Sequence, residues 1–289
     1  MTERLADIGA RIGGIRQLGA VVNAMRGMAA ARAQQAQRQL GAAELFSAML
    51  AAAIGRALAS LQAGESAWPD RPARLGLVLF CAEQGFAGAF SERVLDAVGP
   101  DLSTATLFLI GARGGAIAAE RGITTAWSGA MPSRSVGVPR LAGHIAEALY
   151  VRIAKGEIDR LDAVFSQWLP GHGAHVERRR LFPLDKARFP SLSFPSLADA
   201  NPPLLNLTPE ALLDDLTADY VHAQLCEAAL QAFAAENQAR MESMASAHNE
   251  IERQLSQLQG QQRVVRQEEI TAEIIELAAG EAASRMNGQ

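Results

Sequence analysis

Three glycines near the middle of the chain have the composition of a phosphate-binding turn. Gly111, Gly114 and Gly115 follow the apolar run Thr106–Ile110 and precede a helical stretch. A dinucleotide site uses such a turn to bring backbone N–H groups close to phosphate. The spacing here is G-x-x-G-G rather than G-x-G-x-x-G, and no acidic residue ends the next strand. A tight turn between a strand and a helix is therefore the favoured interpretation.

A second pair of glycines, Gly85 and Gly88, follows another apolar strand in the segment Cys81–Ser91 (CAEQGFAGAFS). A phosphate-binding loop would continue with Lys-Ser or Lys-Thr after the second glycine, and this segment has neither. The pair is interpreted as a tight strand-to-helix turn.

The histidines offer a weaker candidate for metal chemistry. His172 and His175 lie three residues apart in the Gly-rich stretch PGHGAH, which we predict to be a hairpin between two strands. Two such histidines can share a metal ion, but the sequence shows no third ligand. Surface histidines in a turn are the favoured interpretation, and His248 is expected to fix the register of a helix pair.

No group of side chains suggests catalysis, because no serine, cysteine or carboxylate is arranged with a base. We therefore predict no catalytic residue, no cofactor and no metal site. Cys81 and Cys226 are too few for a disulfide framework and favour a reducing compartment. The net charge of −4 and the pI of about 5.8 argue against a general nucleic-acid binder.

The N-terminus lacks the apolar core of a signal peptide, and the chain contains no run of eighteen apolar residues. We expect no segment to enter a membrane directly. Any membrane association would pass through a partner.

The last third of the chain predicts one long helix. The stretch Ala211–Ala283 contains no proline, and Thr208 and Pro209 are a suitable N-cap and first helical residue. Two rows of residues recur at sevens with an offset of four, which is the pattern of a coiled-coil seam. The rows are Leu230, Asn237, Met244, Ile251, Leu258 and Val265, and Ala234, Met241, His248, Leu255 and Gln262.

The N-terminal stretch Leu5–Leu61 provides the partner. Its rows are Ile8, Ile15, Val22, Ala29 and Ala36, and the weaker Ile12, Gly19, Arg26, Ala33 and Leu40, which we expect Leu18 and Met25 to supplement. Met25, Met28, Met241 and Met244 are predicted core methionines. One seam at each terminus predicts an antiparallel pair within one chain. Charge favours the same pairing: residues 1–60 hold seven Arg and three acidic residues, and residues 207–289 hold five Arg and fourteen acidic residues.

Between the two arms the sequence alternates between strands and helices, which predicts an α/β domain with a mostly parallel sheet. The chain is thus expected to comprise an N-terminal arm at 1–62, an α/β domain at 72–205 and a C-terminal arm at 207–289. Breaks in the pattern are expected at Gly64–Pro72 and in the proline-rich linker Asp185–Pro209. The predicted strands are Arg74–Phe80, Thr106–Ile110, Thr124–Trp127, Leu161–Trp168 and Val176–Phe182, and the predicted helices are Ser91–Val98, Ala116–Arg121 and Pro139–Lys155.

The C-terminal motif carries a specific resemblance. The run ENQARMESMASAHNE followed by VVRQEEITAEIIELAAGEAA resembles the gamma subunit of F-type ATP synthases, whose pattern is close to ENxxRMxAMxxAxxNA…RQxxITxEIxEIxxGAxA. The first arm echoes the family at Arg11, Ile12, Ala24, Met25 and Met28, among others. The middle motif SDRGLCGGFN becomes AEQGFAGAFS, which keeps Gly85, Gly88 and Phe90. The resemblance covers the whole chain in the same order.

Several departures from the family pattern are typical of a divergent branch, such as an alternative rotary ATPase. The Asp and Cys of the middle motif are replaced by Glu or Ala. The Thr-Lys of the first arm is Val22-Asn23, and the basic residues of that arm are all arginine.

The resemblance implies a non-catalytic central rotor shaft that couples ion flow to ATP synthesis or hydrolysis. Its implied partners are the alpha and beta subunits of the hexamer, an epsilon subunit and a membrane ring of c subunits, on the cytoplasmic face of a bacterial inner membrane. Contact with the catalytic subunits is carried over to Arg240, Arg266, Gln267, Thr271 and Glu273, and the shaft core to Met25, Met241 and Met244.

Two other functions compete with this reading. A coiled-coil adaptor would join two partners through the α/β domain and act as a free homodimer. A nucleotide-binding enzyme would bind nucleotide through residues 72–205 alone.

Overall fold

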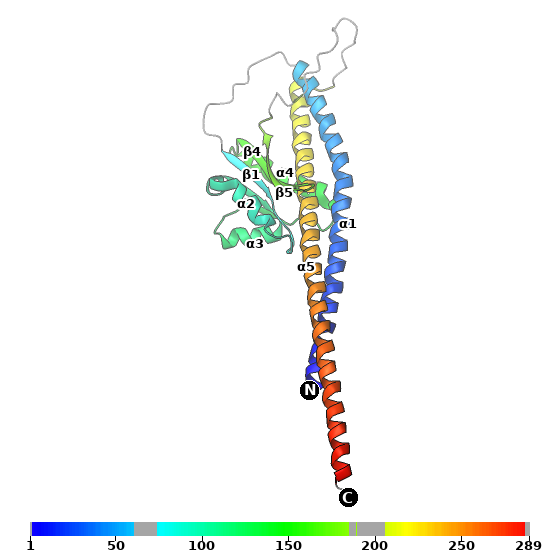
Figure 1. Cartoon of the computed structure of the whole chain (residues 1–289). Coiled ribbons are helices and arrows are strands. Elements are labelled where there is room, and N and C mark those ends of the chain that lie inside the picture. Colours follow the sequence, from blue (N-terminus) through cyan, green and yellow to red (C-terminus); the bar gives the residue numbers. More distant parts are fainter. Residues whose placement is uncertain (1, 61–73, 185–188, 190–205, 287–289) are drawn as a thin grey trace. The chain divides into compact units, whose positions relative to one another are not determined.

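The computed structural model of the protein describes residues 2–60, 74–184, 189 and 206–286 (Figure 1). The chain forms two compact units, one of residues 1–28 with 241–289 and one of residues 29–240. Two helices contribute to both units, α1 (Thr2–Ser60) and α5 (Pro209–Met286). The predicted break at Gly64–Pro72 and most of the predicted linker Asp185–Pro209 lie outside the described residues.

Helix α5 begins where its capping residues predict. The backbone N–H of Ala211 donates to Thr208 Oγ1 at 3.3 Å, and the N–H of Leu212 donates to the Thr208 carbonyl at 2.9 Å. The side chain thereby satisfies one of the free N–H groups of the first turn. With 78 residues, α5 is about 117 Å long at ~1.5 Å per residue.

The first unit is a two-helix coil, and its antiparallel direction is confirmed. Ile8 and Ile12 of α1 cluster with Leu258 and Val265 of α5. Val22, further along α1, clusters with the earlier α5 residues Met244 and Ile251. Each seven-residue position of the leading α5 row, from Leu230 to Val265, is buried. Glycine at position 19 leaves room for Ile251, since a Cβ there would lie 3.2 Å from Ile251 Cγ2.

Two predictions about the α1 seam were wrong. Leu18 and Met28 have more than half of their surface exposed, so neither fills the seam. Ile15 and Met25 instead pack against the Val22 cluster, because these positions lie on the face of α1 that meets α5.

By length and composition alone, α1 is the one described helix that is apolar enough to cross a membrane. Its apolar residues include seam residues packed against α5, such as Ile8 and Val22, and also the exposed side chains of Leu45, Phe46 and Met49.

The second unit contains a five-stranded sheet in the order β3-β2-β1-β4-β5. Strands β1 (Leu75–Phe80), β2 (Thr106–Ile110), β3 (Trp127–Gly129) and β4 (Arg160–Leu169) are parallel to their neighbours, and β5 (Gly173–Phe182) is antiparallel to β4. The predicted mostly parallel sheet is confirmed. Strand β3 overlaps its predicted range Thr124–Trp127 at Trp127 only.

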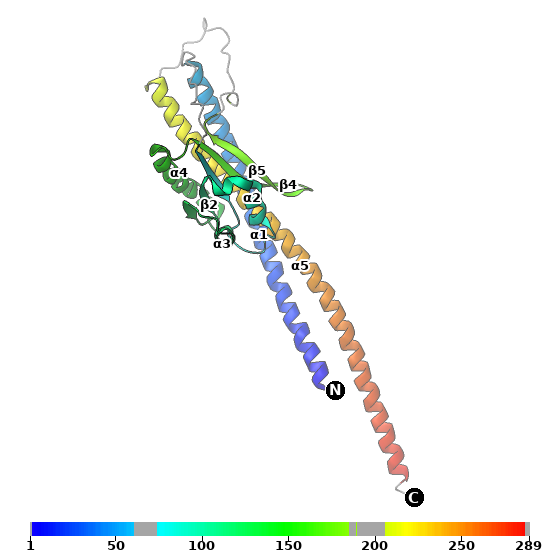
Figure 2. The same ribbon diagram turned by 90° about the vertical axis from the view of Figure 1, so that its left-hand side faces the viewer.

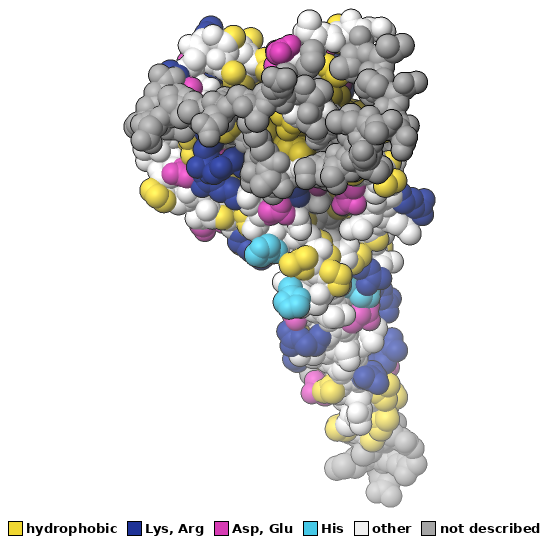
Figure 3. All heavy atoms as spheres, turned by 90° about the horizontal axis from the view of Figure 1, so that it is seen from above, with side chains coloured by type: hydrophobic (Ala, Val, Ile, Leu, Met, Phe, Trp, Pro, Cys, Tyr) yellow, Lys and Arg dark blue, Asp and Glu magenta, His cyan; other side chains and the backbone are white. Residues whose placement is uncertain are grey.

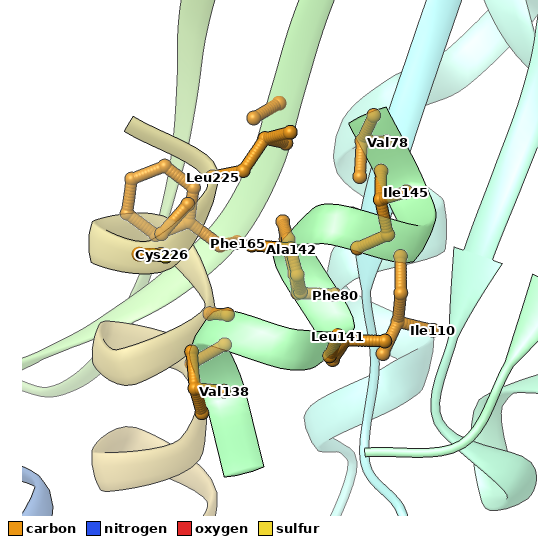
Figure 4. Close-up of a cluster of buried hydrophobic side chains, with 14 of the residues drawn as sticks. Val78, Phe80, Ile110, Val138, Leu141, Ala142, Ile145, Phe165, Leu225 and Cys226 are labelled. Atoms are coloured by element: carbon orange, nitrogen blue, oxygen red, sulfur yellow. The ribbon is translucent and has the colours of Figure 1, made fainter. Parts of the chain in front are cut away.

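Alternate residues of the central strands face two different cores. Leu77 and Leu79 of β1 pack with α2 (Phe90–Val98) and α3 (Ala112–Glu120) on one face of the sheet. Val78 and Phe80 face the other core, which contains α4 (Val138–Ala154) and α5. Figure 4 shows Leu141, Ala142 and Ile145 of α4 beside the strands, and Phe165 of β4 beside Leu225 and Cys226 of α5.

Helix α3 begins at Ala112, four residues before the predicted start at Ala116. Gly114 and Gly115 therefore lie inside the helix rather than in the turn. The reason is close packing, since a Cβ on Gly114 would lie 2.1 Å from the Cβ of Cys81. Gly111 supplies the turn itself, with φ at +107°. Two short 3₁₀ turns, η1 (Gly99–Ser103) and η2 (Ser135–Gly137), complete the unit.

Candidate functional site

The C-terminal part of α5, which we call the tip (Arg266–Ala279), is a helix that packs against no other element among the described residues. Helix α5 continues beyond the first residues of α1 in both ribbon views (Figure 2). Every tip residue except Glu269 is exposed, including the predicted contact residues Arg266, Gln267, Thr271 and Glu273. A helix with this exposure and no internal partner is available to another molecule.

Apolar and polar groups share the surface of the tip. Ile270, Ile274 and Leu277 follow one another at spacings of four and three, so they form a stripe on one side of the helix, and Leu277 is 70% exposed. Thr271 Oγ1 donates to the Gln267 carbonyl at 2.8 Å. This bond leaves the hydroxyl oxygen free to accept a hydrogen bond from outside.

Arg240, the fifth predicted contact residue, lies in a different environment. It is only 5% exposed. Its guanidinium pairs with Glu236 one turn earlier and donates to the carbonyls of Gln84 at 3.1 Å and Gly85 at 3.0 Å. Glu236 in turn accepts the N–H of Gln84 at 3.2 Å. Arg240 therefore fastens α5 to the loop between β1 and α2.

That loop exposes an aromatic side chain in a strained conformation. Phe86 has φ of +62°, in the left-handed region that bulky residues rarely adopt, and is 66% exposed. Strain of this kind persists only where surrounding contacts impose it. The bonds from Glu236 and Arg240 to Gln84 and Gly85 supply such contacts next to Phe86.

Glu83 occupies the position where a phosphate would bind in a nucleotide site. Its carboxylate accepts the N–H of Ala112, at the start of α3, at 3.0 Å and the N–H of Met131 at 2.8 Å. The positive end of the helix dipole and the N–H of Ala112 are thus already paired with an internal anion. Together with the packing role of Gly114, this contact accounts for the glycine turn without a ligand.

A second buried ion pair fastens α5 to β5. Arg179 of β5 contacts Glu227 of α5 at 2.5 Å and Glu177 at 2.8 Å, and lies 4.9 Å from the centre of the Phe165 ring. Burial would lower the pKa of Arg179, but its hydrogen bonds to Glu177 and Glu227 outweigh that effect and raise the pKa above its ordinary value. The guanidinium is therefore always charged.

Both cysteines are buried thiols. Burial, with smaller contributions from Glu92 and Glu236, raises the pKa of Cys81 to about 12. Burial raises the pKa of Cys226 to about 11. A thiol that stays protonated at neutral pH is a poor nucleophile and a poor metal ligand.

The three methionines predicted for the shaft differ in burial. Met244 is buried in the cluster of Val22 and Ile251, and Met25 packs against that cluster. Met241 is half-buried. Flexible thioether side chains suit a narrow seam that contains both large residues and alanines.

Sequence reasoning missed Glu83, Phe86, Arg179 and Glu227. Glu83 was detectable in principle, because an acidic residue three positions after the end of a parallel strand lies near the helix N-termini at that sheet edge. No local pattern marks the pairing of Arg179 with Glu227, which are 48 residues apart.

These features define a class of protein, a structural shaft with an attached α/β domain. In the residues that the structure describes, the buried polar side chains mainly hold the protein's own parts together. Basic and acidic side chains are interspersed on the face seen in Figure 3, with no single large patch of either sign.

The chain belongs to the ATP synthase gamma chain family. A family model described as ATP synthase matches residues 4–283. The ATP synthase gamma chain of Streptomyces avermitilis is 27% identical over 284 residues, which cover 91% of this chain and 90% of that one. The gamma chain of Chlorobium luteolum is 25% identical, with coverage of 96% and 97%.

Solved structures show the same fold. A chain of the Euglena gracilis mitochondrial ATP synthase, in a structure of OSCP, F1 and the c-ring, matches with a TM-score of 0.65 at 13% identity and covers 100% of this chain and 97% of its own. A chain of the Tetrahymena thermophila central stalk and c-ring matches with a TM-score of 0.56 at 14% identity, with coverage of 78% and 99%. The protein is thus a gamma chain of the ATP synthase family, and it shares the fold of these solved chains.

Proposed function

We propose that this chain carries rotation between a membrane ring of c subunits and the alpha and beta subunits of a catalytic hexamer. The α/β domain would face the ring together with an epsilon subunit, on the cytoplasmic side of a bacterial inner membrane. The relatives are bacterial gamma chains, one similar solved chain comes from a structure of OSCP, F1 and the c-ring, and another comes from a structure of the central stalk and c-ring. The three-part division at 1–62, 72–205 and 207–289 belongs to the same proposal.

The observation that carries the proposal is the exposed tip of α5. An isolated helix with an apolar stripe needs a surrounding partner to cover Ile270, Ile274 and Leu277. A single asymmetric helix inside three equivalent catalytic sites contacts each one differently. Each orientation then stabilises a different conformation, and so a different nucleotide affinity, at each site.

Within the tip, Arg266, Gln267, Thr271 and Glu273 are the proposed polar contacts with the catalytic subunits. Neutral hydrogen bonds in water contribute about 0.5–1.5 kcal/mol each, which allows them to break and reform during rotation. Contacts through Arg266 or Glu273 would be stronger, because one partner is charged.

For Arg240 the proposed role is indirect. Because its guanidinium is fully engaged inside the protein, it would act on the catalytic subunits indirectly, by fixing the loop that exposes Phe86. Met25, Met241 and Met244 would form the core of the shaft.

Two substitutions with matched controls test the tip. Thr271→Val removes the hydroxyl and keeps the shape, and Thr271→Ser restores the hydroxyl. Arg266→Leu removes the charge and keeps bulk, and Arg266→Lys keeps the charge. In the assembled complex we expect Thr271→Val and Arg266→Leu to lower ATP turnover or ion pumping, while the controls stay near wild type.

Assembly is expected to be normal in all four variants, because these side chains are exposed. Wild-type turnover and pumping in both Thr271→Val and Arg266→Leu would show that the tip is only a solvated helix surface. Tight nucleotide binding by the isolated chain, measured by calorimetry, would instead support the enzyme alternative.

A further inference from the structure

The segment Val221–Arg240 of α5 is enclosed by the second unit, and we call it the embedded segment. From Val221 to Asn237 every residue except His222 and Gln231 is buried. A helix that is buried on all sides is surrounded by other elements rather than lying on a surface. The embedded segment shares a core with residues of α1, α4 and the sheet.

Apolar packing alone does not fix a single rotational angle over the whole of this segment. Its buried surface combines the large side chains of Leu225, Leu230 and Phe233 with the small residues Ala228, Ala229, Ala232 and Ala235. The hydrophobic effect is non-directional, so it opposes withdrawal of the helix more than turning of the helix about its own axis. Alanine adds little relief to the helix surface that could interlock with its neighbours.

Two polar contacts of α5, which we call attachments, hold the helix at one rotational angle. The first is Glu227, which contacts Arg179 of β5 at 2.5 Å and also accepts from Gln224 at 3.1 Å. The Arg179 side chain is 13% exposed and that of Glu227 is 10% exposed. A turn of the helix by one residue position would separate two charges that have little access to water.

The second attachment is the pair of Glu236 and Arg240 with the backbone of Gln84 and Gly85. Glu236 and Arg240 lie nine and thirteen residues beyond Glu227, so the two attachments are about 14–20 Å apart along α5 and about 140–180° apart around it. The two attachments bind different sides of the helix. A rotation of α5 about its own axis would therefore break both of them.

We propose that these two attachments form a torque clamp, which fixes the α/β domain rotationally to the shaft. The inference rests on the proposed rotor function and goes beyond it. Rotation applied to the domain passes to α5 through Arg179 with Glu227 and through Arg240 with Glu236. These are positioning residues, since none of them touches a nucleotide or an ion.

The test uses the assembled complex with a double substitution, Arg179→Met with Glu227→Met. Replacing both Arg179 and Glu227 leaves neither charge of this pair without its partner, whereas removing only one of them is costly. Glu177 also loses its contact with Arg179, but its side chain is 30% exposed and remains accessible to water. The clamp predicts that the double variant assembles and hydrolyses ATP but moves fewer ions per ATP, with a loss of about twofold or more. A probe on the α/β domain should also show a wider angular spread when the hexamer is stalled.

A matched control is the exposed pair Glu250 and Arg253, which lie three residues apart on α5. The double substitution Glu250→Met with Arg253→Met removes an ion pair of the same chemistry without touching the clamp. Its ion-to-ATP ratio and angular spread are expected to match those of the wild type.

Every other final result contradicts either the clamp or the proposed function. A wild-type ion-to-ATP ratio and angular spread in the Arg179 and Glu227 double variant overturn the clamp. If that variant does not assemble, Arg179→Lys is measured in the same way. Lysine keeps the charge but loses the forked geometry, so the clamp predicts a smaller loss of coupling. Failure of both to assemble makes the pair a folding element and overturns the clamp. If the wild-type complex does not couple hydrolysis to pumping, the proposed function fails instead.

Discussion

The embedded segment and the tip belong to one helix, yet they use charge in opposite ways. In the embedded segment Glu227, Glu236 and Arg240 are buried and paired. In the tip Arg266 and Glu273 are exposed and form no ion pair with the residues that the structure describes. Buried charges fix a geometry because separating them leaves uncompensated charge, and exposed charges are solvated and exchange partners at little cost. Burial, rather than residue type, therefore decides whether a charged side chain on α5 keeps one fixed partner or exchanges partners.

The largest expected contrast comes from replacing one arginine in each region. Arg240→Met leaves the buried Glu236 without its partner and the carbonyls of Gln84 and Gly85 without a donor, which should lower the free energy of unfolding by about 3–5 kcal/mol. Arg266→Met on the tip should change it by less than about 0.5 kcal/mol. Urea unfolding of the full chain, followed by circular dichroism, measures both. Equal effects of the two substitutions would show that the embedded charges are not structurally special.

A smaller difference between the two regions is expected when an alanine in each region is replaced by leucine. Ala229 is fully buried, so Ala229→Leu should overpack the core and lower the free energy of unfolding by about 1–3 kcal/mol. Ala272→Leu on the exposed tip makes the same change at no such cost, since leucine and alanine are both good helix formers. Thermal unfolding of the two variants compares the sites directly. A stable Ala229→Leu variant would mean that the embedded segment has free space around it.

The smallest expected effect is a difference in chemical reactivity between a thiol in the embedded segment and a thiol at the tip. Cys226 in the embedded segment has its pKa raised to about 11 by burial, so it should react slowly with iodoacetamide at pH 8. A cysteine introduced at the tip by Ala272→Cys should react at the rate of a free thiol. Mass spectrometry of timed samples gives both rates. Fast labelling of Cys226 in the native chain would contradict the enclosure of the embedded segment.

The raised pKa of Cys226 makes the free energy of unfolding depend on pH. Cys226 ionises near 9.0 when unfolded and near 11 when folded. Its contribution is fully present below pH 9 and is lost as the pH rises through 11, because the unfolded state releases its proton first. Cys226→Ala should flatten that part of the stability profile.

Much of the fold could be predicted from the sequence. Seven-residue spacing located the seam residues Ile251 and Leu258, and the absence of proline predicted both long helices. Apolar runs located β1, β2 and β4, the charged β5 was also predicted, and β3 was placed several residues too early. The start of α3 was missed because Gly114 normally indicates a turn, and only its packing against Cys81 explains a glycine inside the helix.

The candidate site was predictable only in part. The tip was identified by a motif, and its exposure agrees with a surface that meets another molecule. The same motif-based reasoning grouped Arg240 with the tip residues, although Arg240 is buried against Gln84 and Gly85. A motif gives residue identity and order, and it does not say whether a side chain points toward the protein or away from it.

The sequence by itself determined the periodic features of this protein: two long helices with complementary seams, and an α/β domain between them. These follow from local spacing, because a helix or strand places residues at fixed intervals on one face. Only the tertiary structure decided that Glu227 meets Arg179 and that Arg240 meets a loop 155 residues earlier in the chain. Such contacts depend on which side of α5 faces the sheet once the elements have packed, and no interval along the chain encodes that direction.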